Sequence, residues 1–385
     1  MKYDFKNSLY AKFWESRDAQ NALQVFLNNP ELFEQNYTFW RSQFSVDPYT
    51  QPRANDGTAT FKTIVKKREE AGLLNMRAPL GDAVPRDKEG IEFYTGSIPD
   101  FIADAFVETA MERETKERMF DEYFGNDATI VSVFADRVQL LIDEGNQTMS
   151  NLAAQLLSKG NMVVHFGKGI HSPVGSAPIP QENFIKAGAK AWTDPECELI
   201  SQMTDIEEKY RRDHNLENAS LKWQIPRKMF FNVFLKNKQV IEYVKAWCTI
   251  NEKVFLDSMT LTEDLYRLAF ANQELISPIE LIEEKQKDGT NGYVHGWEEG
   301  IVVLRPAGPA GVVKRASILD TLMWRKYGNN AISKVFATTS IFTLVNSVIP
   351  NGMYKEWHTD LMVSAIPTLE EFLYHLIIDT TRADS

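Results

Sequence analysis

The chain has 385 residues, of which 43% are hydrophobic and 25% charged, proportions typical of a globular protein with a sizeable core. Lysine and arginine total 42 against 53 aspartates and glutamates, so the formal net charge is -11 and the sequence pI is about 5.2. This acidic balance argues against a protein that grips nucleic acid through a basic surface. No segment approaches the roughly 18 consecutive apolar residues of a membrane helix. Two isolated cysteines, Cys197 and Cys248, argue against a disulfide framework and a cysteine-rich metal site and fit a reducing cytoplasm.

Residues 1–49 carry many aromatic side chains among charged and polar ones. The interleaved charges argue against a signal peptide, and the aromatic content argues against a disordered tail. The segment is either a small helical cap on its own core or an arm that buries its aromatics against a neighbouring subunit. For the second reading, in which isolated aromatic anchors dominate an interface, the candidate contacts are Trp14, Phe26, Phe33 and Trp40.

Residues 50–98 contain many turn-forming residues between short β-prone pieces such as TATFKTIVKK. Nearly fifty residues with so many glycines and prolines cannot close a compact core alone. We expect a long two-stranded projection whose contacts are mostly with other chains; the alternative is a hairpin folded back on its own domain. The candidate contact residues in this segment are Phe61, Ile64, Lys66 and Lys67.

Residues 127–159 have apolar side chains at three- and four-residue spacing, which predicts one long amphipathic helix. Asn126 or Asp127 supplies the N-cap, and Lys159-Gly160 ends it. The Gly- and Pro-rich stretch 163–190 is expected to be a loop with two solvated histidines, His165 and His171. A phosphate site is disfavoured because the earlier glycine and the Ser or Thr of a phosphate-binding loop are missing, and a metal site because the two histidines have no third ligand nearby. A second helix is expected to open at Asp194-Pro195, with proline at its first position.

The polar stretch 211–220 predicts a domain boundary near Ser220, followed by a lobe over 221–345 that mixes strands and short helices. The end of the chain, 351–381, has two alternating apolar runs, Tyr354 to Ile366 and Phe372 to Asp379. We expect both runs to be strands that pack with the helix 127–159, so that the terminus is built into a sheet.

Motifs for catalysis and cofactor binding are missing from the sequence: there is no Gly-x-Ser-x-Gly, no His-Glu-x-x-His and no Gly-x-Gly-x-x-Gly after a strand. Adjacent carboxylates such as Glu207-Glu208 point in different directions along either kind of element, so a solvated face explains them better than acid–base chemistry. We therefore assign no catalytic, cofactor-binding or metal-ligating residues.

Four segments resemble, in the same order, those of the E-type major capsid proteins of tailed bacteriophages: 76–110, 127–159, 296–311 and 351–381. The resemblance implies the Hong Kong 97-like α+β fold. Its parts would be an N-terminal arm (1–49), an extended β-hairpin loop (50–98), a peripheral domain (99–220) with the spine helix 127–159, an axial domain (221–345) and C-terminal strands returning to the peripheral domain (346–385).

This family would make the chain a structural protein and not an enzyme. It would assemble with itself into pentamers and hexamers of an icosahedral shell around double-stranded DNA, in the host cytoplasm and without a membrane. Scaffold, portal and decoration proteins would be further partners, and the packaged DNA would be a non-specific neighbour of an acidic shell that leaves it mobile. The alternatives are a cytosolic α+β enzyme without a recognisable motif, or another virion component such as a tail or connector subunit.

Overall fold

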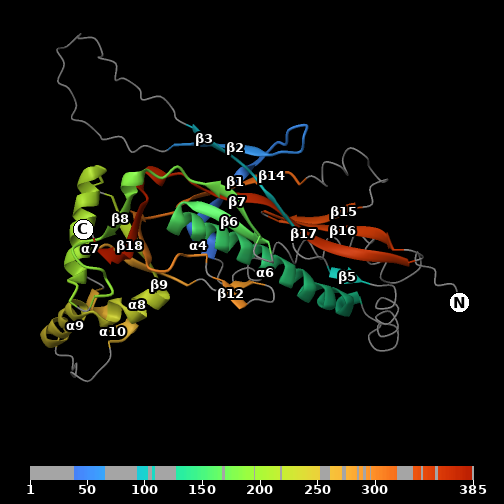
Figure 1. The fold of residues 1–385 in the computed structure, drawn as a ribbon. Helices are drawn as coiled ribbons and strands as arrows, with labels where there is room; N and C mark the ends of the chain where they lie inside the picture. Colours follow the sequence, from blue (N-terminus) through green and yellow to red (C-terminus); the bar gives the residue numbers. More distant parts are fainter. Residues whose placement is uncertain are drawn as a thin grey trace, which may run out of the picture. The chain divides into compact units, whose positions relative to one another are not determined.

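The protein is an α+β chain, as predicted (Figure 1). The chain divides into two compact units. The first unit comprises 1–61, 95–153 and 312–368, and the second comprises 62–94, 154–311 and 369–385. The computed structural model describes residues 39–65, 93–102, 106–108, 127–166, 170–194, 196–216, 219–251, 261–270, 275–283, 286–288, 292–294, 296–318, 333–339, 341–351 and 354–383.

A seven-stranded sheet forms the frame of the first unit. Its path runs β1-β14-β17-β16-β15, and β4 and β5 also pair with β17. The longest pairing is antiparallel and joins β16 to β17, from Phe342↔Val363 to Asn351↔Tyr354. The strands are β1 (Phe44–Gln51), β4 (Asp100–Ile102), β5 (Phe106–Glu108), β14 (Gly311–Ala316), β15 (Ser333–Thr339), β16 (Phe342–Asn351) and β17 (Tyr354–Leu369).

The long helix is α6 (Asp127–Lys159), which has the predicted bounds and is about 50 Å long at 1.5 Å per residue. Gly145 lets it approach the sheet closely, because a Cβ there would lie 2.7 Å from Phe342 and 2.9 Å from Leu361. The helix ends at Gly160, whose φ of +74° favours glycine and whose N–H donates to Leu156 O at 3.0 Å. Apolar spacing and a glycine stop therefore fix this element locally.

The second unit contains a five-stranded sheet in the order β10-β9-β13-β18-β8. Alternate residues of its strands, such as Trp223, Leu304 and Ile378, enter one apolar core. The strands are β8 (Phe184–Ala187), β9 (Leu221–Pro226), β10 (Ile279–Ile282), β13 (Ile301–Pro306) and β18 (Leu376–Ala383). Four of the helices are α7 (Leu199–Asp213), α8 (Arg227–Asn232), α9 (Lys238–Ile250) and α10 (Glu263–Phe270).

Several short elements complete the described chain. Three two-stranded pairs are β2 with β3, β6 with β7, and β11 with β12. Their bounds and those of the remaining helices are β2 (Thr60–Ile64), β3 (Phe93–Ser97), β6 (Asn161–Phe166), β7 (Ile170–Ser176), β11 (Gln286–Asp288), β12 (Gly292–Val294), α4 (Phe39–Gln43) and the short 3₁₀ helices η3 (Gln181–Asn183), η4 (Phe234–Lys236) and η6 (Phe372–Tyr374).

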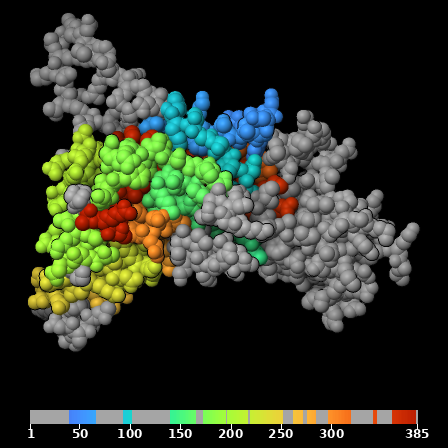
Figure 2. Space-filling model, in the orientation of Figure 1, coloured from blue at the N-terminus to red at the C-terminus, as the bar shows by residue number. Residues whose placement is uncertain are grey.

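The two C-terminal runs are both strands, but they lie in different sheets. β17 belongs to the seven-stranded sheet, whereas β18 pairs with β13 and β8 in the five-stranded one. In Figure 2 the red C-terminal residues lie among the green residues of the second unit. The terminus is thus built into a sheet, but the expected common domain over 346–385 is divided after Thr368.

The expected boundary near Ser220 also differs from the division of the chain. Strand β9, which follows it, and helix α7, which precedes it, share one core. The chain leaves this unit later, after the turn that follows β13, because β14 pairs in the other sheet. Residues 312–345, expected in the axial domain, therefore belong to the first unit.

Two local predictions need correction. The stretch expected to be a loop at 163–190 contains an antiparallel hairpin of β6 and β7, with a register shift between Met162 and Val163. β-prone residues such as Val163 and Val164 form the ladder despite the flanking glycines. Helix α7 begins at Leu199 and not at Asp194-Pro195, because a side chain distant in sequence caps its N-terminus, as described below.

Candidate assembly surface

The ribbon of β2 and β3 is formed by the two ends of the segment predicted to project. In β2 the side chains alternate: Phe61 and Thr63 are buried, and Thr60 and Ile64 are exposed. Phe61 packs against Gly96 of β3, where a Cβ would lie 2.6 Å from the ring. The backbone N–H of Ile98 donates to Ala59 O at 2.8 Å. The blue and cyan residues of this ribbon lie side by side in Figure 2.

Two large apolar side chains remain exposed on the ribbon. Ile64 ends β2 with 53% of its surface exposed, and Phe93 begins β3 with 56% exposed. Both belong to the second unit. One exposed apolar side chain on each of two paired strands makes this end of the ribbon a candidate interaction surface. Sequence reasoning found Ile64 but missed Phe93, although the alternating run IEFYTGS that contains it is a strand signal.

The structure places the other predicted contact residues as follows. Phe61 is buried in its own chain, and so is Trp40, whose Nε1–H donates to Asn146 Oδ1 at 3.0 Å. Residues 39–49 therefore belong to the first unit, as α4 and part of β1. At least this part of the expected arm over 1–49 is packed into the unit and does not form a separate arm. Trp14, Phe26, Phe33, Lys66 and Lys67 lie outside the described residues.

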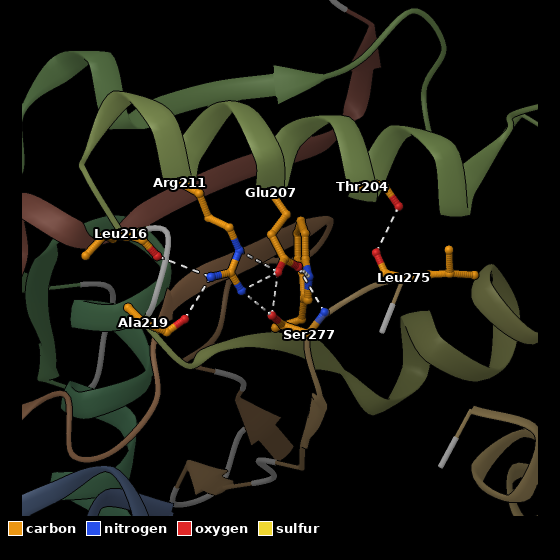
Figure 3. Close-up of polar contacts among 8 residues, drawn as sticks. Thr204, Glu207, Arg211, Leu216, Ala219, Leu275 and Ser277 are labelled. Carbon is orange, nitrogen blue, oxygen red and sulfur yellow. Dashed lines mark hydrogen bonds and ion pairs between the residues drawn. The ribbon is translucent and has the colours of Figure 1, made fainter. Parts of the chain in front are cut away.

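A buried carboxylate organises the second unit (Figure 3). Glu207 of α7 accepts hydrogen bonds from the N–H of Ser277 at 2.9 Å and its hydroxyl at 2.5 Å, and from Trp223 Nε1 at 3.1 Å. Arg211, one turn along the same helix, forms a 2.8 Å ion pair with it. Glu207 thereby ties α7 to β9 and to the residues that precede β10.

The pKa of Glu207 reflects two opposing effects. Burial alone would raise it, but the hydrogen bonds from Ser277, Arg211 and Trp223 favour the charged form, and together they lower the pKa below its usual range. The carboxylate is thus a fixed anion with its acceptor sites occupied. Sequence reasoning placed the pair Glu207-Glu208 on a solvated face, which is wrong for Glu207 and right for its exposed neighbour.

Arg211 also shapes the turn after α7. Its Nη1 donates to Leu216 O at 3.2 Å and to Ala219 O at 2.8 Å, and Figure 3 shows both carbonyls pointing toward the guanidinium. Asn215 in this turn has a φ of +51°, a left-handed conformation that asparagine tolerates. Arg211 therefore holds the described residues on both sides of this stretch, Leu216 and Ala219, inside one unit.

A buried arginine orders the turn that follows β13. Arg305 donates from Nη1 to Gly308 O at 2.9 Å and to Pro306 O at 3.1 Å, and from Nε to Gln224 Oε1 at 3.3 Å. Burial lowers the pKa of Arg305 to about 10, so the guanidinium stays charged at neutral pH. The Arg305 guanidinium thus holds the backbone of this turn in place, which is a structural role.

Among the residues that the structure describes, no group of three or more His, Cys, Asp or Glu side chains is arranged to hold a metal ion. The helices in the same described ranges include none long and apolar enough to cross a membrane.

Known proteins resemble this chain in structure, at low sequence identity. Neither the protein-family models nor the curated proteins contain a match to this chain. Similar solved structures include the putative capsid protein of a prophage of E. coli CFT073, at 14% identity and a TM-score of 0.48, covering 94% of this chain and 98% of that one. A satellite phage P4 procapsid structure that includes the size determination protein has 7% identity and a TM-score of 0.45, covering 94% of this chain and 100% of that one. A phage-related protein of Bordetella bronchiseptica RB50 has 11% identity and a TM-score of 0.44, with 93% and 96% covered.

Proposed function

We propose that this chain is a major capsid protein that self-assembles into the shell of a tailed phage. The observation that carries the proposal is the β2–β3 ribbon, whose exposed Ile64 and Phe93 stand at the two ends of the segment 66–92. A shell subunit acts by contacting other copies of itself. It therefore needs exposed apolar contact surfaces, and it does not need a catalytic site. The buried charges described above, at Glu207 and Arg305, serve the backbone and fit that role.

Shell assembly distributes binding energy over many weak contacts. Each copy would contribute one ribbon, and because every lattice position repeats the contact, a modest loss per copy is multiplied across the shell. The finer parts of the proposal are pentamers and hexamers, assembly in the host cytoplasm, contacts with scaffold, portal or decoration proteins, and an acidic lining that repels packaged DNA.

Electron microscopy and analytical ultracentrifugation of the purified full chain test the proposal. Closed shells of uniform diameter are expected. Rings or tubes would favour a tail or connector subunit, and small discrete oligomers with no shells under any assembly condition would overturn the capsid assignment.

The contribution of the ribbon is tested by the double substitution of Ile64→Ser and Phe93→Ser. Because both side chains are exposed in the subunit, we expect folding to be retained and shell yield to fall at least tenfold. Leu268→Ser is the matched control, since it removes a similarly exposed apolar side chain from α10. Equal losses in both variants would mean that the ribbon has no special role.

A further inference from the structure

Arg53 lies at the base of the ribbon, in the turn between β1 and β2. It forms an isolated antiparallel bridge with Ala59, and the turn between them is closed by the Ala54 N–H donating to Thr58 O at 2.8 Å. Asp56 Oδ1 accepts from the Thr58 N–H at 2.9 Å, and Gly57 supplies a φ of +85°. The backbone of this turn is thus closed by its own hydrogen bonds. The Arg53 guanidinium adds one bond to the turn, at Gly57 O, and makes its other contacts on the side of the sheet.

The guanidinium of Arg53 joins its own turn to three segments that are distant in sequence. Its Nε donates to Ser317 O, just beyond β14, and its Nη2 donates to Ser364 Oγ of β17 at 2.9 Å. It also forms a two-pronged ion pair with Asp100 of β4, in which Nη1 donates to Oδ2 at 2.9 Å and Nη2 donates to Oδ1. Nη1 donates in addition to Gly57 O at 2.8 Å.

These contacts hold both limbs of the ribbon to one place. The incoming limb passes through Arg53 itself, and the outgoing limb, β3, continues within three residues to Asp100. Ser317 follows β14 and Ser364 lies in β17, two strands of the seven-stranded sheet. The Ser364 hydroxyl also donates a hydrogen bond to Asp100 Oδ1. All of these residues lie in the first unit.

The burial of the two charged partners is unequal. The Arg53 side chain is only 2% exposed, whereas that of Asp100 is 43% exposed. A buried guanidinium needs its donors occupied, and only the planar five-donor fork of arginine can serve acceptors on several sides at once. A lysine would keep the charge but direct its donors from a single point, so it could not satisfy the same set.

We propose that Arg53 is a positioning residue that fixes the base of the β2–β3 ribbon, residues 60–61 and 95–97 of the first unit, on the seven-stranded sheet. With the fork intact, both limbs start from one set of acceptors and this base has a single orientation. Without the Arg53 guanidinium, the turn around Gly57 stays closed by its own hydrogen bonds. The turn can then dock on the sheet in several orientations. On the proposed function, the same residue keeps the shell diameter uniform.

The direct test measures the orientation of the ribbon in the full chain. Spin labels are placed by Thr95→Cys on β3 and Gln147→Cys on α6, two exposed positions in the first unit, while the native cysteines are buried. The labelled chain is diluted into an excess of unlabelled chain, so that electron–electron dipolar spectroscopy reports distances within one molecule. The parent is expected to give one narrow distance distribution.

Arg53→Lys is expected to widen that distribution at least twofold while the far-ultraviolet circular dichroism is unchanged. Arg267→Lys is the matched control, because this exposed arginine pairs with Glu263 on the surface of α10 in the second unit and should leave the distribution as in the parent. A folded Arg53→Lys chain with the parent's distribution overturns the proposal.

A milder variant covers the case in which Arg53→Lys does not fold. Ser364→Ala removes one acceptor of the Arg53 guanidinium and keeps the pair with Asp100, so a smaller widening of the distance distribution is expected. If Arg53→Lys does not fold, an unchanged width in Ser364→Ala overturns the proposal.

The assembly experiment is separate. If the parent forms no shells, the proposed function fails and the spin-label result still stands; if Arg53→Lys forms shells with the parent's diameter spread, the link from orientation to shell size fails.

Discussion

His375 donates a 2.6 Å hydrogen bond from Nε2 to the backbone carbonyl of Leu157, in the last turn of α6. Carbonyls in this turn have no partner within the helix, and His375, just before β18, supplies one from more than 200 residues further along the chain. The end of the long helix and the last strand are thus joined inside the second unit.

The burial of His375 predicts acid-sensitive stability. Burial lowers the pKa of His375 to about 4; the bond to Leu157 raises it and the charge of Arg305 lowers it. Because the unfolded chain, with a pKa near 6.5, takes up the proton first, stability should fall as the pH drops below about 6.5 and level off near pH 4. The full loss is about 3 kcal/mol at about 1.4 kcal/mol per tenfold change in proton affinity.

Urea unfolding between pH 7 and pH 4 measures this loss. His375→Gln keeps a donor for Leu157 but does not titrate, so the difference in unfolding free energy between the parent and this variant should shrink or reverse as the pH falls. A pH-independent difference would contradict the assignment.

Glu207→Ala should destabilise the subunit strongly. It leaves the indole N–H of Trp223, both donors of Ser277 and the charge of Arg211 without their acceptor. Breaking a buried pair by removing one partner costs about 3–5 kcal/mol. Chemical denaturation checks this, with Glu208→Ala as the exposed neighbour expected to change the free energy of unfolding by less than about 0.5 kcal/mol. Similar costs for the two would show that the network is not what stabilises the unit.

Gln239→Ala should weaken the start of α7. The Gln239 side chain, from α9, accepts from the Ile200 N–H at 2.7 Å and the Ser201 N–H at 3.3 Å, and donates to Ser201 Oγ at 2.7 Å. The Gln239 side chain thus accepts the hydrogen bonds that an N-cap residue would accept. Removing an N-cap side chain lowers the free energy of unfolding by about 1 kcal/mol. Thermal unfolding measures the cost, and exposed Lys238→Ala is the control. Combining Gln239→Ala with Ser201→Ala should be less than additive, since the two side chains share one bond.

Gly96→Ala should destabilise the ribbon. The new Cβ would approach the buried Phe61 ring to 2.6 Å, so the ring must move, at a cost of about 1–3 kcal/mol. In a Phe61→Ala background the same change should cost little, because the obstructing ring is gone. Hydrogen exchange of the Ile98 amide and the free energy of unfolding test this, with Thr95→Ala as the exposed control. Equal costs of Gly96→Ala in both backgrounds would contradict the contact.

Local sequence determined the elements whose signals are local. Apolar spacing and the Lys159-Gly160 stop gave the bounds of α6, and the alternating run from Tyr354 gave β17, because helix and strand periods depend on neighbours within a few residues. The α+β capsid fold was implied by the resemblance of four segments to the capsid family, whereas the composition fitted an enzyme equally well.

Tertiary structure alone decided which side chains are covered and by what. Trp40, predicted as an interface anchor, bonds to Asn146 across 106 positions, and Glu207, predicted to be solvated, meets Ser277 across 70. The start of α7 depends on Gln239, and β18 joins a different sheet from β17. Burial, and capping by a residue distant in sequence, depend on which segments the tertiary fold brings together. A short window of neighbouring residues does not contain that information.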